Sequence, residues 1–123
     1  GESDPVAAGR AADERIADLD WPLDVAWLGV GEDGHTASIF PGPDFEAAIA
    51  GPKARRAIGV RPDPLPENAP VPRVTLTGPT LVSARTVTLT VSGKAKRKVV
   101  EQALKQGSSS KLPIGRLLAE LDM

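Results

Sequence analysis

The 123-residue chain has no cysteine and no tyrosine, and it contains only two tryptophans and two phenylalanines. Without cysteine it has no disulfide, no thiolate nucleophile and no cysteine ligand for a metal. With so few aromatic residues, its core must be built mainly from Ala, Val, Leu and Ile. A single histidine, His35, combined with the lack of cysteine, argues against a zinc site.

Long apolar runs and strong net charge are also missing. No apolar run approaches the ~20 residues that a membrane-spanning helix needs. The formal net charge of −1 favours neither nucleic acid nor an acidic membrane as a partner. The first residues lack the basic and apolar regions of a signal peptide and an initiator methionine. We therefore expect a cytoplasmic chain that was processed, tagged or taken from a longer protein.

Helical and strand-like patterns alternate along the chain, which predicts a layered α/β fold with a largely parallel sheet. The apolar run at 25–28 does not alternate, which suits a parallel strand covered on both faces. Segment 61–72 holds five prolines and is expected to be irregular. The predicted helices cover 7–19, 36–40, 45–49, 79–84, 94–105 and 113–121, and the predicted strands cover 24–29, 57–60, 73–77 and 86–91. On residues 7–19, Ala8, Ala12, Ile16 and Leu19 form the predicted apolar stripe.

A glycine-rich turn follows the first predicted strand and carries His35. Its glycines, Gly31 and Gly34 among them, allow close approach of the backbone to a substrate. His35 could act as a general base on water, and either Asp33 or Glu32 could orient its imidazole. Backbone N–H groups at the start of the following helix could hold an oxyanion. The alternative is a strand-to-helix turn with a capping aspartate and a solvated histidine.

Basic residues gather at the start of the predicted helix 94–105. On a helical wheel Lys96 falls near the middle of the apolar face, whereas Lys94, Arg97 and Lys98 point elsewhere. An inward lysine there would overhang the carboxyl edge of the sheet, where α/β proteins bind phosphate. The alternative is a lysine that covers apolar surface with its stem. Arg73, at the start of a strand, offers a fork for phosphate, although taken alone it reads as a surface arginine.

Four segments together resemble a known family. Residues 29–42 (GVGEDGHTASIFPG) closely resemble the signature of 6-phosphogluconolactonases, and 72–77 (PRVTLT), 91–96 (VSGKAK) and 112–118 (LPIGRLL) are similar to its later motifs in order and spacing. The resemblance implies a Rossmann-like sugar-phosphate isomerase fold and hydrolysis of 6-phospho-D-glucono-1,5-lactone to 6-phosphogluconate in the oxidative pentose phosphate pathway. It implies no metal and no organic cofactor. By motif position, His35 is the implied catalytic base, and Arg73 and Lys96 are the implied phosphate ligands.

The chain also departs from this family. Members are about twice as long, and their amino-terminal half carries a first strand and a Gly/Ser-rich loop that helps to hold the sugar phosphate. We therefore expect residues 1–123 to form a single domain that corresponds to the carboxyl-terminal half. Alone, it should have an incomplete site and be weakly active or inactive. It should expose apolar surface where strands are missing, and it should self-associate or pair with an amino-terminal half.

Two other functions stay open. Glucosamine-6-phosphate deaminases resemble this group but carry an Asn and an acid where this chain has Ser38, Ile39 and Phe40. A non-catalytic sugar-phosphate sensor would use the same fold and would carry a helix-turn-helix, which we do not find. His35 within the complete glycine turn favours catalysis over sensing.

Overall fold

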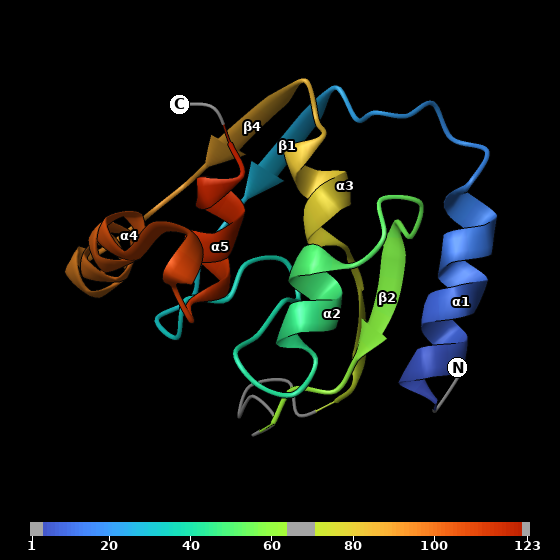
Figure 1. The fold of residues 1–123 in the computed structure, drawn as a ribbon, viewed down its shortest axis with the longest axis horizontal. Helices are drawn as coiled ribbons and strands as arrows, with labels where there is room; N and C mark the ends of the chain where they lie inside the picture. Colours follow the sequence, from blue (N-terminus) through green and yellow to red (C-terminus); the bar gives the residue numbers. More distant parts are fainter. Residues whose placement is uncertain (1–3, 64–70, 122–123) are drawn as a thin grey trace.

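The computed structural model describes residues 4–63 and 71–121 of the chain (Figure 1). Helices and short strands alternate as the sequence predicts. The helices are α1 (Pro5–Ile16), α2 (Phe45–Ala50), α3 (Gly78–Val82), α4 (Lys94–Gln106) and α5 (Pro113–Ala119), with a 3-10 turn, η1 (Gly107–Ser109), between the last two. The strands are β1 (Val25–Leu28), β2 (Ala57–Val60), β3 (Arg73–Leu76) and β4 (Thr86–Leu89).

The strands form two separate pairs rather than one sheet. Strands β1 and β4 pair in parallel, with Val25 opposite Thr86 and Leu28 opposite Leu89. Strands β2 and β3 pair antiparallel, which the expectation of a largely parallel sheet did not include. Parallel strands need a long crossover, usually a helix, and the prolines of segment 61–72 disfavour one. Residues 64–70 of that segment lie outside the described residues, and its remaining residues form neither helix nor strand.

One face of the parallel pair is buried and the other is open. Ala26 and Leu28 of β1 join the core with Leu81 of α3 and Ile114 of α5, and both helices lie on the same side of the strands in Figure 1. The expectation that the first strand is covered on both faces is therefore wrong.

The open face carries exposed apolar side chains, whereas the sequence predicts exposed apolar surface where strands are missing. Val25 is 56% exposed and Trp27 is 75% exposed, and they stand opposite Thr86 and Thr88 of β4, which are also exposed. Since the described helices cover only the opposite face, nothing in this part of the chain buries these side chains. Whether this face drives self-association stays a prediction.

Helix α1 packs closely against β2. It begins where the Asp4 side chain accepts a hydrogen bond from the Val6 N–H at 2.9 Å, with a proline at its first position. A Cβ on Gly9 would overlap the backbone of Gly59 in β2, so the two backbones touch. Asp13 Oδ1 also accepts the N–H groups that begin β2.

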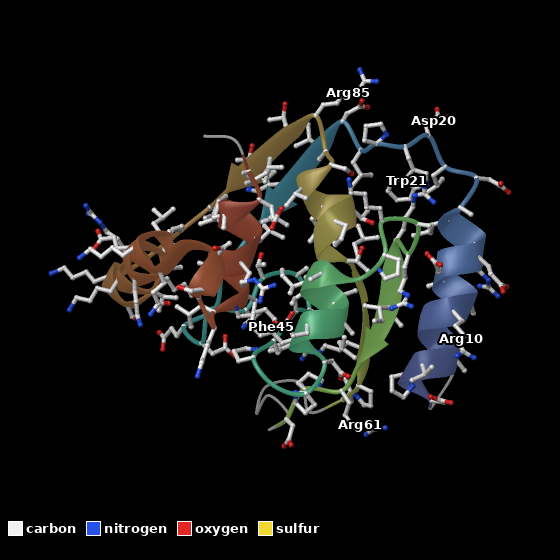
Figure 2. The ribbon with its side chains drawn as sticks, in the orientation of Figure 1. Arg10, Asp20, Trp21, Phe45, Arg61 and Arg85 are labelled. Atoms are coloured by element: carbon white, nitrogen blue, oxygen red, sulfur yellow. The ribbon has the colours of Figure 1, made fainter. Side chains whose placement is uncertain are left out.

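The first helix ends earlier than the sequence predicts. It stops at Ile16, so Leu19 lies beyond it and is 57% exposed instead of joining the apolar stripe. The Trp21 indole N–H donates to the Ile16 carbonyl at 3.0 Å, and the Arg56 guanidinium lies 4.9 Å over the indole ring. Figure 2 shows Trp21 at this connection between α1 and β1.

The predicted helix at 36–40 is wrong. Thr36 and Ile39 form an isolated antiparallel bridge through two backbone hydrogen bonds. Between them Ala37 has a φ of 51°, which is left-handed and ends any right-handed helix. The other helices lie where the sequence places them, to within a few residues at each end. Within residues 4–63 and 71–121, the helices are too short or too polar to cross a membrane.

Candidate active site

Two segments leave the same edge of the parallel pair. Residues 29–40, the histidine loop, follow the carboxyl end of β1, and α4 follows the carboxyl end of β4 after a short connection. The Thr90 N–H donates to the Leu28 carbonyl at 2.9 Å, which extends the parallel pairing to this edge. In α/β proteins the carboxyl edge of parallel strands is where ligands bind.

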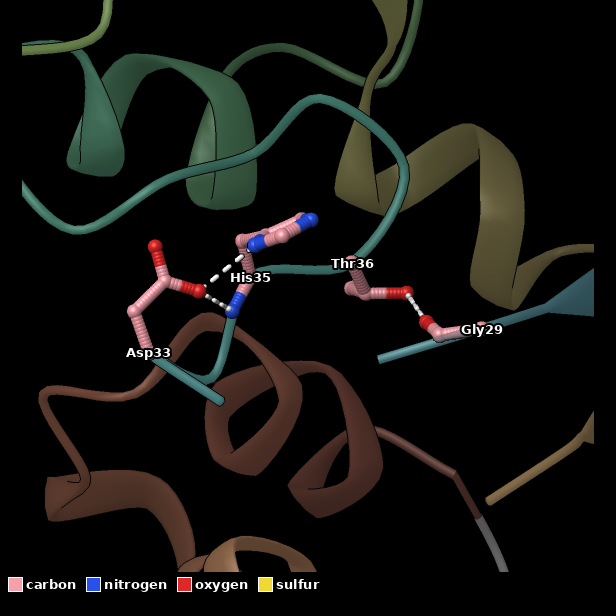
Figure 3. Close-up of polar contacts among 4 residues, drawn as sticks. All are labelled: Gly29, Asp33, His35 and Thr36. Atoms are coloured by element: carbon pink, nitrogen blue, oxygen red, sulfur yellow. Dashed lines mark hydrogen bonds and ion pairs between the residues drawn. The ribbon is translucent and has the colours of Figure 1, made fainter. Parts of the chain in front are cut away.

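Internal hydrogen bonds close the histidine loop. The Gly31 N–H donates to the His35 carbonyl at 2.9 Å, and the Gly34 N–H donates to the Gly31 carbonyl at 3.0 Å. The fully buried Thr36 hydroxyl donates to the Gly29 carbonyl at 2.8 Å, as Figure 3 shows. These bonds join Gly29 and Gly31 to Thr36 and His35, and they close the turn that carries the histidine.

Two further bonds anchor the loop to the rest of the domain. The Ile114 N–H at the start of α5 donates to the Gly34 carbonyl at 2.9 Å. The Ser38 N–H donates to the Thr75 hydroxyl of β3 at 3.1 Å, and the neighbouring Ile39 is fully buried. The loop is therefore fixed between α5 on one side and β3 on the other.

Asp33 orients the imidazole of His35. Its Oδ1 accepts the His35 backbone N–H at 3.0 Å and lies 2.5 Å from the ring Nδ1 (Figure 3). An ionised carboxylate only accepts hydrogen bonds, so in the neutral imidazole Nδ1 carries the proton and Nε2 keeps its lone pair. Of the two carboxylates that the sequence left open, Asp33 and not Glu32 makes this contact within the described residues. The His35 side chain is 33% exposed, so solvent reaches part of it.

The two glycines of the predicted site shape the loop. A Cβ on Gly31 would overlap the His35 ring at Cε1 and Nδ1, so the imidazole lies directly against this residue. Gly34 has a φ of +85°, and a Cβ there would press into Leu112. Both positions require glycine for steric reasons.

Five loop amides already donate hydrogen bonds, so they are not available as the oxyanion donors that the sequence predicts. The N–H groups of Gly31, Gly34, His35, Thr36 and Ser38 all donate within the protein. No helix begins directly after the turn, because 36–40 forms a bridge. An oxyanion would need donors other than these five amides.

Arg73 and His35 meet at one aromatic ring. The His35 imidazole stacks on Phe40 with ring centroids 4.5 Å apart, and the Arg73 guanidinium lies 5.1 Å over the same ring. Arg73 begins β3, so residues far apart in the chain converge here. Sequence reasoning did not assign Phe40 a role, since its contacts with His35 and Arg73 arise only in the folded chain.

Lys96 lies in the first turn of α4. It is half-buried, whereas Lys94, Arg97 and Lys98 are exposed, which is the pattern that the helical wheel predicts. The helix leaves the same strand edge as the histidine loop. Its role as a phosphate ligand stays a prediction.

A separate hollow lies away from the histidine loop. A cavity of about 790 Å³ opens between α2, α3 and α5, and its lining includes Trp21, Arg56 and Arg116 but not His35, Arg73 or Lys96. We place the candidate site at His35, because a cavity without an oriented base offers no chemistry comparable to the Asp33–His35 pair. Across the described residues, no cluster of three or more His, Asp and Glu side chains could hold a metal ion.

These features define an α/β protein that holds a histidine, oriented by a carboxylate, at the carboxyl edge of parallel strands. The chain belongs to the family of glucosamine-6-phosphate isomerases and 6-phosphogluconolactonases, whose model matches residues 1–122. The 6-phosphogluconolactonase of Rhizobium meliloti is 39% identical over 113 residues, 91% of this chain and 47% of the relative. That of Pseudomonas putida is 35% identical over 91% of this chain and 45% of the relative.

Solved structures agree with this assignment. A 6-phosphogluconolactonase from Shewanella baltica matches with a TM-score of 0.84 and 30% identity, over 99% of this chain and 50% of that one. The enzyme of Trypanosoma brucei matches with a TM-score of 0.75 and 31% identity, over 99% of this chain and 49% of that one. The fold is therefore the Rossmann-like α/β fold of this family. The chain spans about half the length of the relatives it matches.

Proposed function

We propose that the chain supplies the catalytic histidine of a cytoplasmic 6-phosphogluconolactonase, which hydrolyses 6-phospho-D-glucono-1,5-lactone to 6-phosphogluconate. The observation that carries the proposal is the Asp33–His35 pair, which leaves Nε2 as an available base. The Rhizobium meliloti and Pseudomonas putida relatives are named for this activity. Arg73, through its guanidinium, and Lys96 are the proposed ligands of the 6-phosphate.

The proposed reaction needs one proton carrier. Water attacks C1 of the lactone while His35 Nε2 takes its proton, and Asp33 stabilises the imidazolium that forms. The tetrahedral intermediate then collapses, the bond between C1 and the ring oxygen breaks, and Nε2 returns the proton to that oxygen. The product is an open-chain acid with a new hydroxyl group. Anchoring of the phosphate would hold C1 near Nε2 throughout.

We also propose that residues 1–123 correspond to the carboxyl-terminal half of the domain and work only when paired with an amino-terminal half. Val25 and Trp27 on the open face of β1 support this, because parallel sheets are normally covered on both faces. A second copy of this chain is the competing occupant of that face. Size measurement of the chain, alone and with an added amino-terminal half, separates the two.

The test compares this chain alone with the chain fused behind the amino-terminal half of the Rhizobium meliloti relative, called the fused protein below. We expect lactone hydrolysis by the fused protein and little by the chain alone. His35→Ala in the fused protein should lower kcat/KM at least ~100-fold, with partial rescue by added imidazole.

Three results would contradict the proposal. A loss below about tenfold for His35→Ala would remove His35 from the reaction. Ammonia release from glucosamine 6-phosphate would instead identify a deaminase. Binding of the phosphosugar without hydrolysis would indicate a sensor.

A further inference from the structure

The aromatic ring beside the imidazole has no role in the mechanism above. Phe40 ends the histidine loop, and its half-buried ring stacks on His35 at 4.5 Å with 25° between the ring planes. The same ring lies under the Arg73 guanidinium at 5.1 Å. One side chain thus contacts both the proposed base and a proposed phosphate ligand.

A single hydrogen bond does not fix an imidazole. The bond from Nδ1 to Asp33 sets the position of one ring atom, but the ring can still swing about the Nδ1···Oδ1 line, and its side chain is 33% exposed. Stacking on Phe40 sets the plane of the ring. The two restraints together fix the direction of Nε2, which must point at the attacking water.

Phe40 is itself held in place. Its neighbour Ile39 is fully buried and bridges to Thr36, and Ser38 is bonded to Thr75 of β3. Arg73 begins that same strand, so this tie brings the Phe40 ring beneath the guanidinium. An arginine over an aromatic face is a favourable contact that restrains the phenyl ring from the β3 side.

We propose that Phe40 is a positioning residue, which holds the plane of the His35 imidazole by stacking and so directs Nε2 at the attacking water. This proposal rests on the proposed function for its kinetic consequence. Its structural consequence is independent of any activity, because the imidazole plane can be observed directly.

The chain has one histidine and two phenylalanines. All imidazole signals therefore come from His35, and the second phenylalanine serves as a control. Nuclear magnetic resonance of the 123-residue chain reports a single set of imidazole signals, shifted upfield by a stacked ring. Phe40→Leu should abolish that shift, whereas Phe40→Tyr should preserve it. Phe45→Leu is the matched control, because Phe45 also lies under an arginine, Arg116 at 5.5 Å, but does not stack on His35.

The fused protein supplies the second readout. Phe40→Leu should lower kcat about tenfold or more with little change in KM, and Phe40→Tyr should restore it. Unchanged imidazole signals in Phe40→Leu, or an equal change in Phe45→Leu, would overturn the positioning role. If those signals change as expected while the fused protein hydrolyses no lactone, the proposed function fails and the positioning role stands.

Discussion

The histidine loop and the start of α4 leave the same strand edge, yet they are built differently. Within the loop, Gly31, Gly34 and Thr36 donate hydrogen bonds that close the turn, and Asp33 and Phe40 hold the imidazole. Every restraint on His35 comes from the described chain itself. This half of the proposed site is organised before any substrate arrives.

The start of α4 has fewer restraints. Gly93 has a φ of +91°, no side chain caps the helix, and Lys94, Arg97 and Lys98 are exposed. Cations at a helix N-terminus oppose the macrodipole by ~0.3–1 kcal/mol each, which favours an anion at this end. The difference teaches that the fold fixes the imidazole of His35 through several contacts, whereas the described residues restrain the cationic side chains at the start of α4 much less.

The largest effect should come from adding a methyl group beneath the imidazole. Gly31→Ala places a Cβ where His35 Cε1 and Nδ1 now lie, so the ring must move. Because misplacement by about 1 Å can cost ~100-fold, we expect a loss of that order in kcat of the fused protein. Gly29→Ala is the control, since a Cβ there meets no described atom within 4 Å. Equal activity of the two variants would show that the loop adapts and is not preorganised.

A smaller effect is expected from removing the charge of Asp33. In Asp33→Asn, the backbone N–H of His35 still donates to the side-chain oxygen at this position. This bond holds the amide oxygen in place, so the contact with Nδ1 is preserved. Only the stabilisation of the imidazolium is lost, so kcat/KM should fall about tenfold. Glu32→Gln is the matched control and should be silent. A loss as large as that of His35→Ala would mean that the asparagine flips and reverses the tautomer.

Local features of the fold could be predicted from the sequence, and long-range ones could not. Apolar spacing placed the four strands and five of the six predicted helices, since periodicity is set by nearby residues. The helix at 36–40 failed because the Thr36 hydroxyl bonds to Gly29, seven residues away, and Ala37 takes a left-handed conformation. The prolines of 61–72 already disfavour a helical crossover between β2 and β3, but the open face of β1 depends on contacts that no local pattern records.

The candidate site divides in the same way. Asp33 and His35 are two positions apart, so their contact was among the predicted alternatives. Phe40 stacks on His35 and lies beneath Arg73, which joins β3 to the loop. The spacing of these residues in the sequence does not predict this contact. The loop amides were expected to be available, but their hydrogen bonds within the loop are visible only once the turn is built.

The proposed phosphate-binding role of Lys96 at the start of α4 is tested by measuring KM. Lys96→Ala in the fused protein should raise KM about tenfold with little change in kcat, as expected for loss of a charge-assisted hydrogen bond worth about 1.5–3 kcal/mol. Lys98→Ala removes the same charge from the same helical turn but from an exposed position, and it should change KM less than about twofold. Equal effects would mean that the helix acts only through its general positive charge.

The smallest effect should come from the ion pair that joins α2 to α5 near the loop. Arg116 donates to Glu46 at 2.7 Å, and this hydrogen bond lowers the pKa of the exposed Glu46 carboxyl. A carboxyl with a lowered folded pKa stabilises the fold above its unfolded pKa, and that contribution is lost as the pH falls through the folded value. Glu46→Gln should therefore lower the Tm slightly at pH 7, and this difference should shrink as the pH falls below the ordinary range of a glutamate pKa.

Glu101→Gln, which removes the exposed pair with Arg97 on α4, is the matched change in the other region. Surface ion pairs contribute little to stability, so both variants should keep the kcat of the parent fused protein. A clear fall in kcat for Glu46→Gln alone would show that the order of the histidine loop depends on this surface pair as well as on its own hydrogen bonds.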